Sequence, residues 1–331
     1  MGPDGAPVPR RVTNALLLAT LLALVLSGLL GWALPQGSAV SLFQLHRALG
    51  LALLVLIGWK TGIVLPSLRR RLGRDSSTYW GCIAASALLA TVVLGLAWTL
   101  NIISFDLFWG YSPMNVHVAL GIGLLPFVGW HAWIRRRPNR ASAPVVSRRT
   151  ALRLGVVALA GAAGWTAVEP LAGLWNAMRL PSGSKQAASF SANDYPAEIW
   201  LFDSVPSIEA ETWRLRVGER QLTLDDLLRH PRREVQAVLD CTSGWWTEQV
   251  WSGVSLVEIL NTYARVGHAV TVTSVTGHRI EFPLADVRNA LLATHVGDEV
   301  LSPGHGYPVR LVVPGRRGYQ WVKWVAEISV S

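Results

Sequence analysis

Residues 41–65 read SLFQLHRALGLALLVLIGWKTGIVL, an apolar run in which only Arg47 and Lys60 carry a full charge. An α-helix needs about 20 such residues to cross a bilayer, so this segment predicts a membrane span. Other stretches share this character, and the complete set of expected spans is 13–34, 41–65, 79–100, 113–134 and 150–170. Only 15% of the residues are charged, against about 25% in typical soluble domains. This composition argues against a plain cytoplasmic enzyme.

Positive charge is concentrated beside the spans. Residues 1–150 contain 14 basic and 3 acidic side chains, whereas residues 151–331 contain 16 and 18. Arginines precede the first span, follow the second and separate the fourth from the fifth, but the loops 35–40 and 101–112 contain no Lys or Arg. The positive-inside rule therefore predicts a cytoplasmic N-terminus and an extracytoplasmic C-terminal domain in a multi-pass cell-membrane protein. Because the charge flanks apolar runs, we expect membrane lipid as a partner and no nucleic acid.

The fifth span begins with Arg148-Arg149, followed by a mild, Gly/Ala-rich apolar run. This pattern resembles a twin-arginine export signal placed inside the chain. Ordinary positive-inside flanking supplies two arginines equally well, so both interpretations stay open. Twin-arginine export carries domains that have already folded around a cofactor. No cleavage signal is evident, and whether the span is removed also stays open.

Two spans contain a repeated histidine pattern. The sequence HRALG at 46–50 matches HVALG at 117–121, and GWK at 58–60 matches GWH at 129–131 at the same offset. His117 and His131 are fourteen residues apart, close to four helical turns, and so share one helix face. Ionisable groups at membrane depth are costly and usually functional. The second and fourth spans are therefore interpreted as duplicated elements.

Residues 10–140 resemble a four-helix membrane cytochrome b with bis-histidine haem ligation. The resemblance implies one haem b near the outer face with His46 and His117 as axial ligands. It also implies that Arg47 pairs with a haem propionate. Lys60 occupies the position where a second ligand pair would need a histidine. His131 therefore stays open as a polar helix-end residue, a quinone-site group or a ligand of a second haem.

The remainder of the chain has a different periodicity. Residues 176–194 are predicted to be a linker, and 195–331 an α+β domain with its own core. Strands are expected at 212–217, 234–239, 270–275, 310–313 and 322–330, and helices at 224–229, 256–264 and 284–293. The predicted fold is therefore multi-domain: an all-α transmembrane bundle of five spans followed by the α+β domain. Its boundaries are 1–140 for the four-helix domain, 141–175 for the fifth span, and 176–194 and 195–331 for the linker and last domain.

Cys241 is the only cysteine of the last domain and follows a predicted strand, in the sequence LDCTSGWW at 239–246. A thiolate ligand for a soft metal fits this position better than a hydrolytic nucleophile, because no accompanying Cys/His/Asn signature is present. This segment, the run WSGVSLVEIL at 251–260 and the tail HGYPVRLVVPG at 305–315 resemble the sulfite-oxidase family of molybdopterin proteins. The resemblance covers about 195–331 in the same order and spacing.

The resemblance implies a role for each matching residue. Cys241 is the protein thiolate on molybdenum, and His305 and Arg310 contact the pterin and its phosphate. Gly318, Tyr319 and Gln320 close on the phosphate through the backbone, and Lys323 lies near the pterin. A dianionic phosphate needs Arg forks, Lys and close backbone approach, so Arg316 and Arg317 are candidates as well. A solvated turn is the alternative for these two arginines.

Trp245 and Trp246 stand where sulfite oxidases have arginines that hold an oxyanion. This departure favours a neutral or aromatic-compatible substrate, and core packing is the alternative for both residues. The expected substrate is a small molecule or a protein side chain. We expect molybdenum-dependent oxygen-atom transfer in an oxidoreductase that exchanges electrons with haem b and the quinone pool. The reductase direction is favoured by analogy with periplasmic methionine-sulfoxide reductases of that family. A sulfite-type dehydrogenase and an electron-transfer protein without its own substrate are the alternatives.

Overall fold

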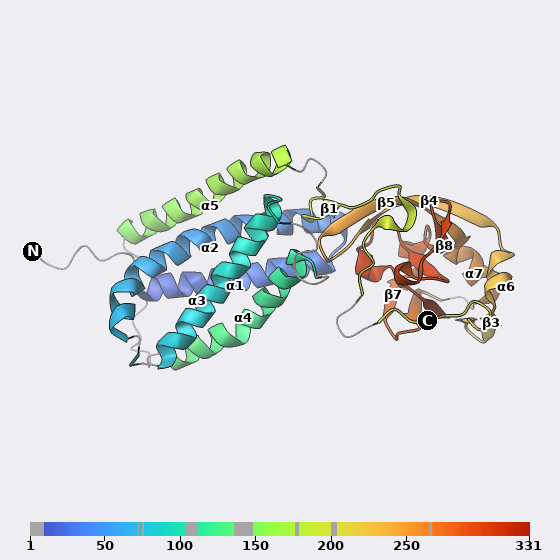
Figure 1. The fold of residues 1–331 in the computed structure, drawn as a ribbon, viewed down its shortest axis with the longest axis horizontal. Coiled ribbons are helices and arrows are strands. Elements are labelled where there is room, and N and C mark those ends of the chain that lie inside the picture. Colours follow the sequence, from blue (N-terminus) through green and yellow to red (C-terminus); the bar gives the residue numbers. More distant parts are fainter. Residues whose placement is uncertain are drawn as a thin grey trace, which may run out of the picture. The chain divides into compact units, whose positions relative to one another are not determined.

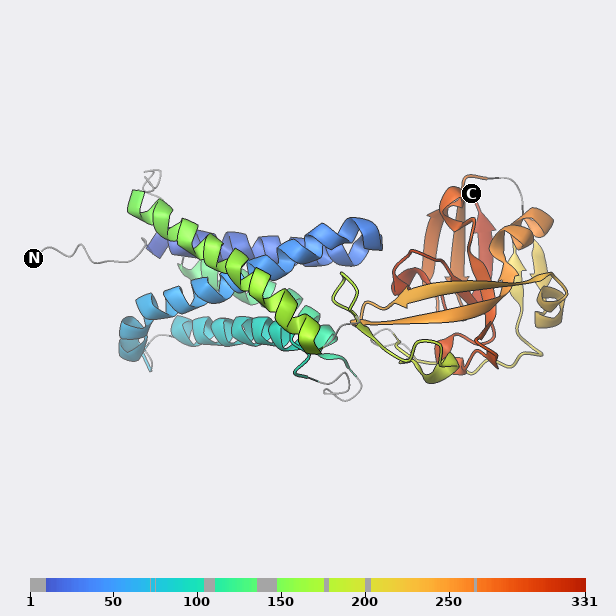
Figure 2. The same cartoon turned by 90° about the horizontal axis from the view of Figure 1, so that it is seen from above.

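The computed structural model describes residues 10–71, 73–74, 76–103, 111–135, 148–175, 179–199, 204–264 and 267–331. Residues 136–147, between the expected fourth and fifth spans, and residues 176–178, at the start of the expected linker, lie outside these ranges. The chain divides into a helical unit, Met1–Gly183, and a second unit, Ser184–Ser331. Figures 1 and 2 show the helices of the first and the mixed sheets of the second.

The helical unit is built from long apolar helices. They are α1 (Arg10–Ala33), α2 (Gln36–Arg71), α3 (Ser76–Thr99), α4 (Pro113–Arg135) and α5 (Arg148–Trp175). Among the described residues, four apolar stretches are long enough to cross a bilayer: Val12–Ala33, Ser38–Leu68, Thr78–Thr99 and Pro113–Ile134. In α5 the described apolar stretch is Gly155–Ala167, which is shorter, so the fifth span stays a prediction.

Small residues let these helices approach closely, as is usual for membrane helix pairs. A Cβ on Gly31 of α1 would lie 3.0 Å from the Phe43 ring of α2, and one on Gly161 of α5 would lie 3.0 Å from Ala52. Their outer faces remain apolar, and Leu159 of α5 is 70% exposed. Figure 2 shows α5 lying across α2. The apolar outer faces fit a lipid surrounding.

The second unit contains two sheets. One has the order β1-β5-β8-β10, with β4 on β5 and β9 on β8, and the other has the order β3-β2-β11-β6-β7. The first comprises β1 (Lys185–Gln186), β4 (Arg232–Asp240), β5 (Trp245–Ser255), β8 (Leu291–Val296), β9 (Glu299–Val300) and β10 (Arg310–Val312). The second comprises β2 (Leu215–Val217), β3 (Arg220–Leu222), β6 (Ala269–Ser274), β7 (Arg279–Pro283) and β11 (Val325–Val330).

Short helices complete this α+β domain, whose class is as expected. They are α6 (Leu224–Leu228), α7 (Leu256–Tyr263) and 3₁₀ turns at Ala192–Asp194, Leu284–Val287, Pro303–His305 and Gly318–Gln320. The core consists of alternating inward side chains of both sheets. Leu215, Val217, Val272, Leu292 and Ile328 have no exposed surface. Strand periodicity thus builds the core against which the loops of the site are placed.

Two sequence predictions are wrong here. The helix expected over 284–293 is a 3₁₀ turn followed by β8. The run after Ala290 pairs with β5 on one edge and β10 on the other, and its side chains are buried on both faces of the sheet. A fully buried strand has no alternating pattern and resembles a buried helix in sequence. The segment 184–194, expected within the linker, instead contains β1, which pairs with β5 at Lys185↔Trp245. Asn193 also binds the backbone of Val300 and Ser302.

Candidate functional site

Cys241 lies in the tight turn that joins β4 to β5. Its backbone N–H donates to the Trp245 carbonyl at 2.8 Å, and the Gly244 N–H donates to the Cys241 carbonyl at 3.1 Å. Gly244 has a φ of +93°, which glycine adopts without steric cost. The antiparallel pairing of β4 with β5 fixes the turn through Asp240↔Trp246. Residue 241 is therefore presented by a rigid hairpin end.

The thiol of Cys241 is protonated in the absence of a metal. Burial raises its pKa to about 11, and the carboxylate of Glu198 adds to the rise, whereas hydrogen bonds from Ser243 and the charge of Lys323 oppose it. A free thiolate nucleophile needs a lowered pKa, so nucleophilic catalysis is not favoured. A metal ion deprotonates a coordinating thiol outright. The environment therefore suits a metal ligand.

Arg310 is a buried cation beside this cysteine. It begins β10, is only 3% exposed, and interacts electrostatically with the Cys241 thiol, while burial lowers its pKa. Its guanidinium donates to the His305 carbonyl at 3.1 Å and lies 5.5 Å and 5.8 Å from the centres of the Trp251 and Trp321 rings. No carboxylate among the described residues pairs with it, and its Nε has no hydrogen-bond partner there.

A buried charge without a counter-charge is costly. Arg310 therefore fits a site whose anionic ligand comes from outside the chain, as the phosphate of a pterin cofactor does. Gln320 adds a buried side-chain oxygen that has no hydrogen-bond partner among the described residues. Buried polar groups without protein partners are expected where a polar cofactor binds. Arg310 and Gln320 therefore fit a site for the pterin cofactor.

His305, Gly306 and Lys323 form the wall next to Arg310. Gly306 has a φ of +114°, and a Cβ there would lie 3.1 Å from the Arg310 Cβ and 3.3 Å from the Lys323 Cα. The Lys323 ammonium donates to the carbonyls of Glu198 and Gly304, both at 2.6 Å. Close packing at Gly306 thus brings together two cationic side chains from different segments of the chain.

His305 is buried and uses both ring nitrogens within the protein. Nδ1 lies 2.7 Å from the Ser302 hydroxyl and Nε2 lies 2.8 Å from the Tyr195 carbonyl. The Tyr195 ring packs on the imidazole at a centre-to-centre distance of 4.0 Å, and burial raises the tyrosine pKa to about 12. In the structure, the His305 ring positions its loop. Its direct contact with the pterin stays a prediction.

The burial of His305 predicts a pH dependence of stability. Burial, with smaller contributions from the charges of Arg310 and Lys323, lowers its pKa from 6.5 to about 4. Because the unfolded chain takes up this proton between pH 6.5 and 4 and the folded chain does not, stability is lost as pH falls through that window. We expect a loss of about 2 kcal/mol between pH 7 and 4.5, measured by denaturant unfolding of the detergent-solubilised chain. His305→Gln should flatten the slope, and an unchanged slope would contradict this origin.

Arg316 and Arg317 have carboxylate partners of their own. Arg316 pairs with Asp286 at 2.6 Å near the surface. Arg317 pairs with Asp240, and both side chains of that pair are almost fully buried. Asp240 also accepts a hydrogen bond of 2.6 Å from the Ser184 hydroxyl. Arg317 thus secures the residue directly before Cys241, and the phosphate contacts expected of both arginines stay predictions.

Replacing Arg317 by Met is expected to lower the free energy of unfolding by about 3 kcal/mol, because Asp240 would keep a buried charge without its guanidinium. The measurement is denaturant unfolding followed by tryptophan fluorescence. Arg316→Met is the matched control, since its partly exposed pair should contribute less than about 1 kcal/mol. Equal effects of the two substitutions would contradict a special role for the buried pair.

Gly318 and its neighbours form the loop against the Cys241 turn. A Cβ at Gly318 would lie 3.0 Å from the Asp240 carbonyl oxygen and 3.2 Å from the Cys241 Cα. The Tyr319 carbonyl lies 2.9 Å from Nε2 of His278. Trp245 and Trp246 are both buried, as core packing requires. The structure therefore brings Gly318 and Arg310 to Cys241.

Sequence reasoning missed several residues of this site. Tyr195 and Trp321 lie in no quoted motif, and Asp240 and Trp251 lie in quoted segments but were given no role there. Only Asp240 had a local signal, since an acidic residue directly before the cysteine at the end of an apolar strand needs a buried partner.

A second candidate site lies in the helical unit. The rings of His46 on α2 and His117 on α4 face each other at a centre-to-centre distance of 6.1 Å. Nδ1 of His46 lies 3.0 Å from the Leu24 carbonyl, and Nδ1 of His117 lies 2.8 Å from the Thr91 carbonyl. Metal-bound histidines usually donate the other ring N–H to such a group, which leaves Nε2 for the metal. The pair therefore fits axial ligation of a haem iron.

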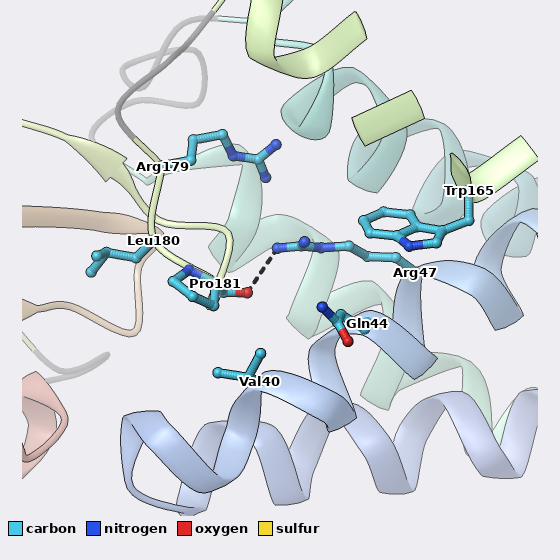
Figure 3. Close-up of a pocket in the computed structure, with 7 residues that line it drawn as sticks. All are labelled: Val40, Gln44, Arg47, Trp165, Arg179, Leu180 and Pro181. Atoms are coloured by element: carbon cyan, nitrogen blue, oxygen red, sulfur yellow. Dashed lines mark hydrogen bonds between the residues drawn. The ribbon is translucent and has the colours of Figure 1, made fainter. Parts of the chain in front are cut away.

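Arg47 follows His46 directly and lies in a pocket of about 290 Å³ at the end of this unit (Figure 3). Its guanidinium donates to the Pro181 carbonyl at 3.0 Å and lies 5.3 Å from the centre of the Trp165 ring. Arg179 lines the same pocket and donates to the Thr99 carbonyl. Two arginines in one pocket suit an anionic group such as a carboxylate. The expected contact of Arg47 with a haem propionate stays a prediction.

Comparison with known proteins identifies the second unit. Residues 202–331 match the family model described as oxidoreductase molybdopterin binding domain. This part of the chain is similar to the molybdopterin-binding domains of oxidoreductases. The match covers Cys241, Arg310 and the loops around them.

The curated relatives are similar over the same region. Mitochondrial sulfite oxidase of Rattus norvegicus is 30% identical over 169 residues, which is 38% of this chain and 30% of that protein. NADH nitrate reductase of Cichorium intybus is 33% identical over 123 residues, 30% of this chain and 13% of that protein. The chain thus spans about a third or less of these relatives. The sulfane dehydrogenase SoxCD structure from Paracoccus pantotrophus is 28% identical, covers 38% of this chain and 39% of that chain, and has a TM-score of 0.36.

Proposed function

We propose that this protein is a membrane-bound molybdenum oxidoreductase that moves electrons between the quinone pool, haem b and an extracytoplasmic molybdopterin centre. Cys241 would be the thiolate ligand of molybdenum, and His46 and His117 the axial ligands of the haem. The observation that carries the proposal is the buried Arg310, whose charge no described carboxylate offsets, beside a cysteine suited to a metal. Oxygen-atom transfer to or from a small molecule or a protein side chain is the proposed reaction, with the reductase direction favoured.

When bound, the molybdenum cofactor supplies two-electron oxygen-atom transfer. The chain binds and orients it. Arg310 and Lys323 provide positive charge next to Cys241, and Gly318 permits close approach of the backbone. His305 stays neutral at pH 7 and holds its loop through Ser302 and Tyr195. The buried Arg317–Asp240 pair keeps the cysteine turn in place.

Two alternatives remain as competing functions. The similarity to sulfite oxidase favours a sulfite-type dehydrogenase that sends electrons inward, but the buried Trp245 and Trp246 supply no cation for an oxyanion. A haem and molybdopterin electron-transfer protein without its own substrate is the second alternative. The reductase and the dehydrogenase differ in the substrate that they consume. In the reductase electrons pass from the haem to the molybdenum centre, and in the dehydrogenase they pass from the molybdenum centre to the haem.

The test begins with the molybdenum and iron content of the detergent-purified full chain. Near-equal molybdenum and iron are expected, and iron without molybdenum from cells able to make the cofactor would contradict the enzyme proposal. The loaded protein is then assayed with reduced quinone analogue plus methyl sulfoxides, and with sulfite plus an electron acceptor. Turnover with sulfoxides supports the reductase, turnover with sulfite supports the dehydrogenase, and neither supports the electron-transfer alternative.

A further inference from the structure

The pairs α1–α2 and α3–α4 repeat one local structure. A Cβ on Gly28 would lie 3.2 Å from Cε1 of His46, and one on Gly95 would lie 2.9 Å from Cε1 of His117. In each pair the histidine Nδ1 meets a backbone carbonyl four residues before that glycine, at Leu24 and at Thr91. Each outer histidine therefore packs in a glycine cradle on its neighbouring helix.

The inner end of α3–α4 repeats the cradle. Gly81 precedes Gly95 by fourteen residues, and His131 follows His117 by the same number. A Cβ on Gly81 would lie 2.9 Å from Cε1 of His131, so this imidazole also needs a residue without a side chain opposite it. One helical pair thus presents two histidines, each against its own glycine.

The inner end of α1–α2 has neither member of this arrangement. Fourteen residues before Gly28 stands Asn14, and fourteen residues after His46 stands Lys60. The Lys60 ammonium donates a hydrogen bond to the Asn14 side-chain oxygen. A protonated ammonium has no lone pair to give to a metal, and an asparagine side chain stands at the position that the other pair leaves bare. Asn14 and Lys60 thus belong together, because each is the hydrogen-bond partner of the other.

We propose that the bundle binds a single haem, on His46 and His117, and that its inner end is a closed second haem site in which Asn14 and Lys60 replace a glycine and a histidine. The inference rests on the proposed haem ligation and adds the haem number and its cause. His131 keeps its glycine cradle, but the matching position on α2 is Lys60 and not a histidine. It is therefore not a haem ligand in this chain.

Haem per chain in the purified full-length protein, measured by pyridine haemochrome, tests this proposal. We expect about one haem in the natural chain and a single wave in a potentiometric titration. His131→Ala should retain that haem. Two haems, or loss of haem in His131→Ala, would overturn the proposal. No haem at all would instead contradict the proposed function, so the two failures are distinguishable.

Building a second haem site at the inner end of the bundle is the stronger test. The double variant Asn14→Gly/Lys60→His is expected to bind about two haems, with a second low-spin signal, and adding His131→Ala should return it to about one. Lys60→His alone should remain near one haem, because the Asn14 side chain still stands in the cradle. A double variant that stays at one haem, while folded by circular dichroism, would overturn Asn14 and Lys60 as the cause.

Discussion

Replacing Cys241 by Ser is expected to lower substrate turnover by on the order of 1000-fold, comparable with the loss of a group that acts at a reacting centre. Cys241 is the one cysteine of the second unit, and its thiol would become a thiolate only on a metal. A hydroxyl of similar size retains the turn but is a harder, more basic ligand. Turnover is measured with methyl sulfoxides or with sulfite, whichever the natural chain converts, and molybdenum content is measured on the same sample.

Cys82→Ser is the matched control, because this second cysteine lies within α3 of the helical unit. It should leave both turnover and molybdenum content unchanged. If Cys241→Ser retained full turnover with a full complement of molybdenum, the cysteine would not be the metal ligand. A melting temperature close to that of the natural chain separates a chemical effect from misfolding.

Replacing His117 by Ala is expected to reduce haem from about one to below about 0.1 per chain, because a bis-histidine site loses half of its axial ligation. The 6.1 Å between the His46 and His117 rings is the structural basis for this effect. Molybdenum content should not change, since Cys241 belongs to the other unit. Absorption in the Soret region and iron analysis measure the loss.

The control for this variant is His131→Ala on the same helix, where the imidazole packs on Gly81 as His117 packs on Gly95. It removes an equivalent ring at the same kind of helix contact and should retain haem. Retention of haem in His117→Ala would show that the facing pair is a structural contact. Equal losses in both variants would point to a general weakening of the helix packing.

Local sequence patterns predicted those elements whose formation depends on neighbouring residues, above all the long apolar helices. Bilayer thickness sets a length of apolar helix, so four membrane-spanning candidates were readable from hydropathy. Strand β8 was missed because a strand buried on both faces has no alternation, and β1 was missed because two residues gain their structure only by pairing with Trp245 and Trp246 of β5.

The sequence by itself determined the residue types of the site: one cysteine after a strand, basic residues and glycines in the last loops, and histidines at repeated positions within spans. Only the tertiary structure decided their roles. Arg317 pairs with the carboxylate of Asp240, whereas no carboxylate among the described residues pairs with Arg310, which separates two arginines that are alike in sequence. Gly81 beside His131 and Asn14 beside Lys60 likewise distinguish two positions that correspond in sequence. The reason is that burial and pairing join residues far apart in the chain, and local composition does not report them.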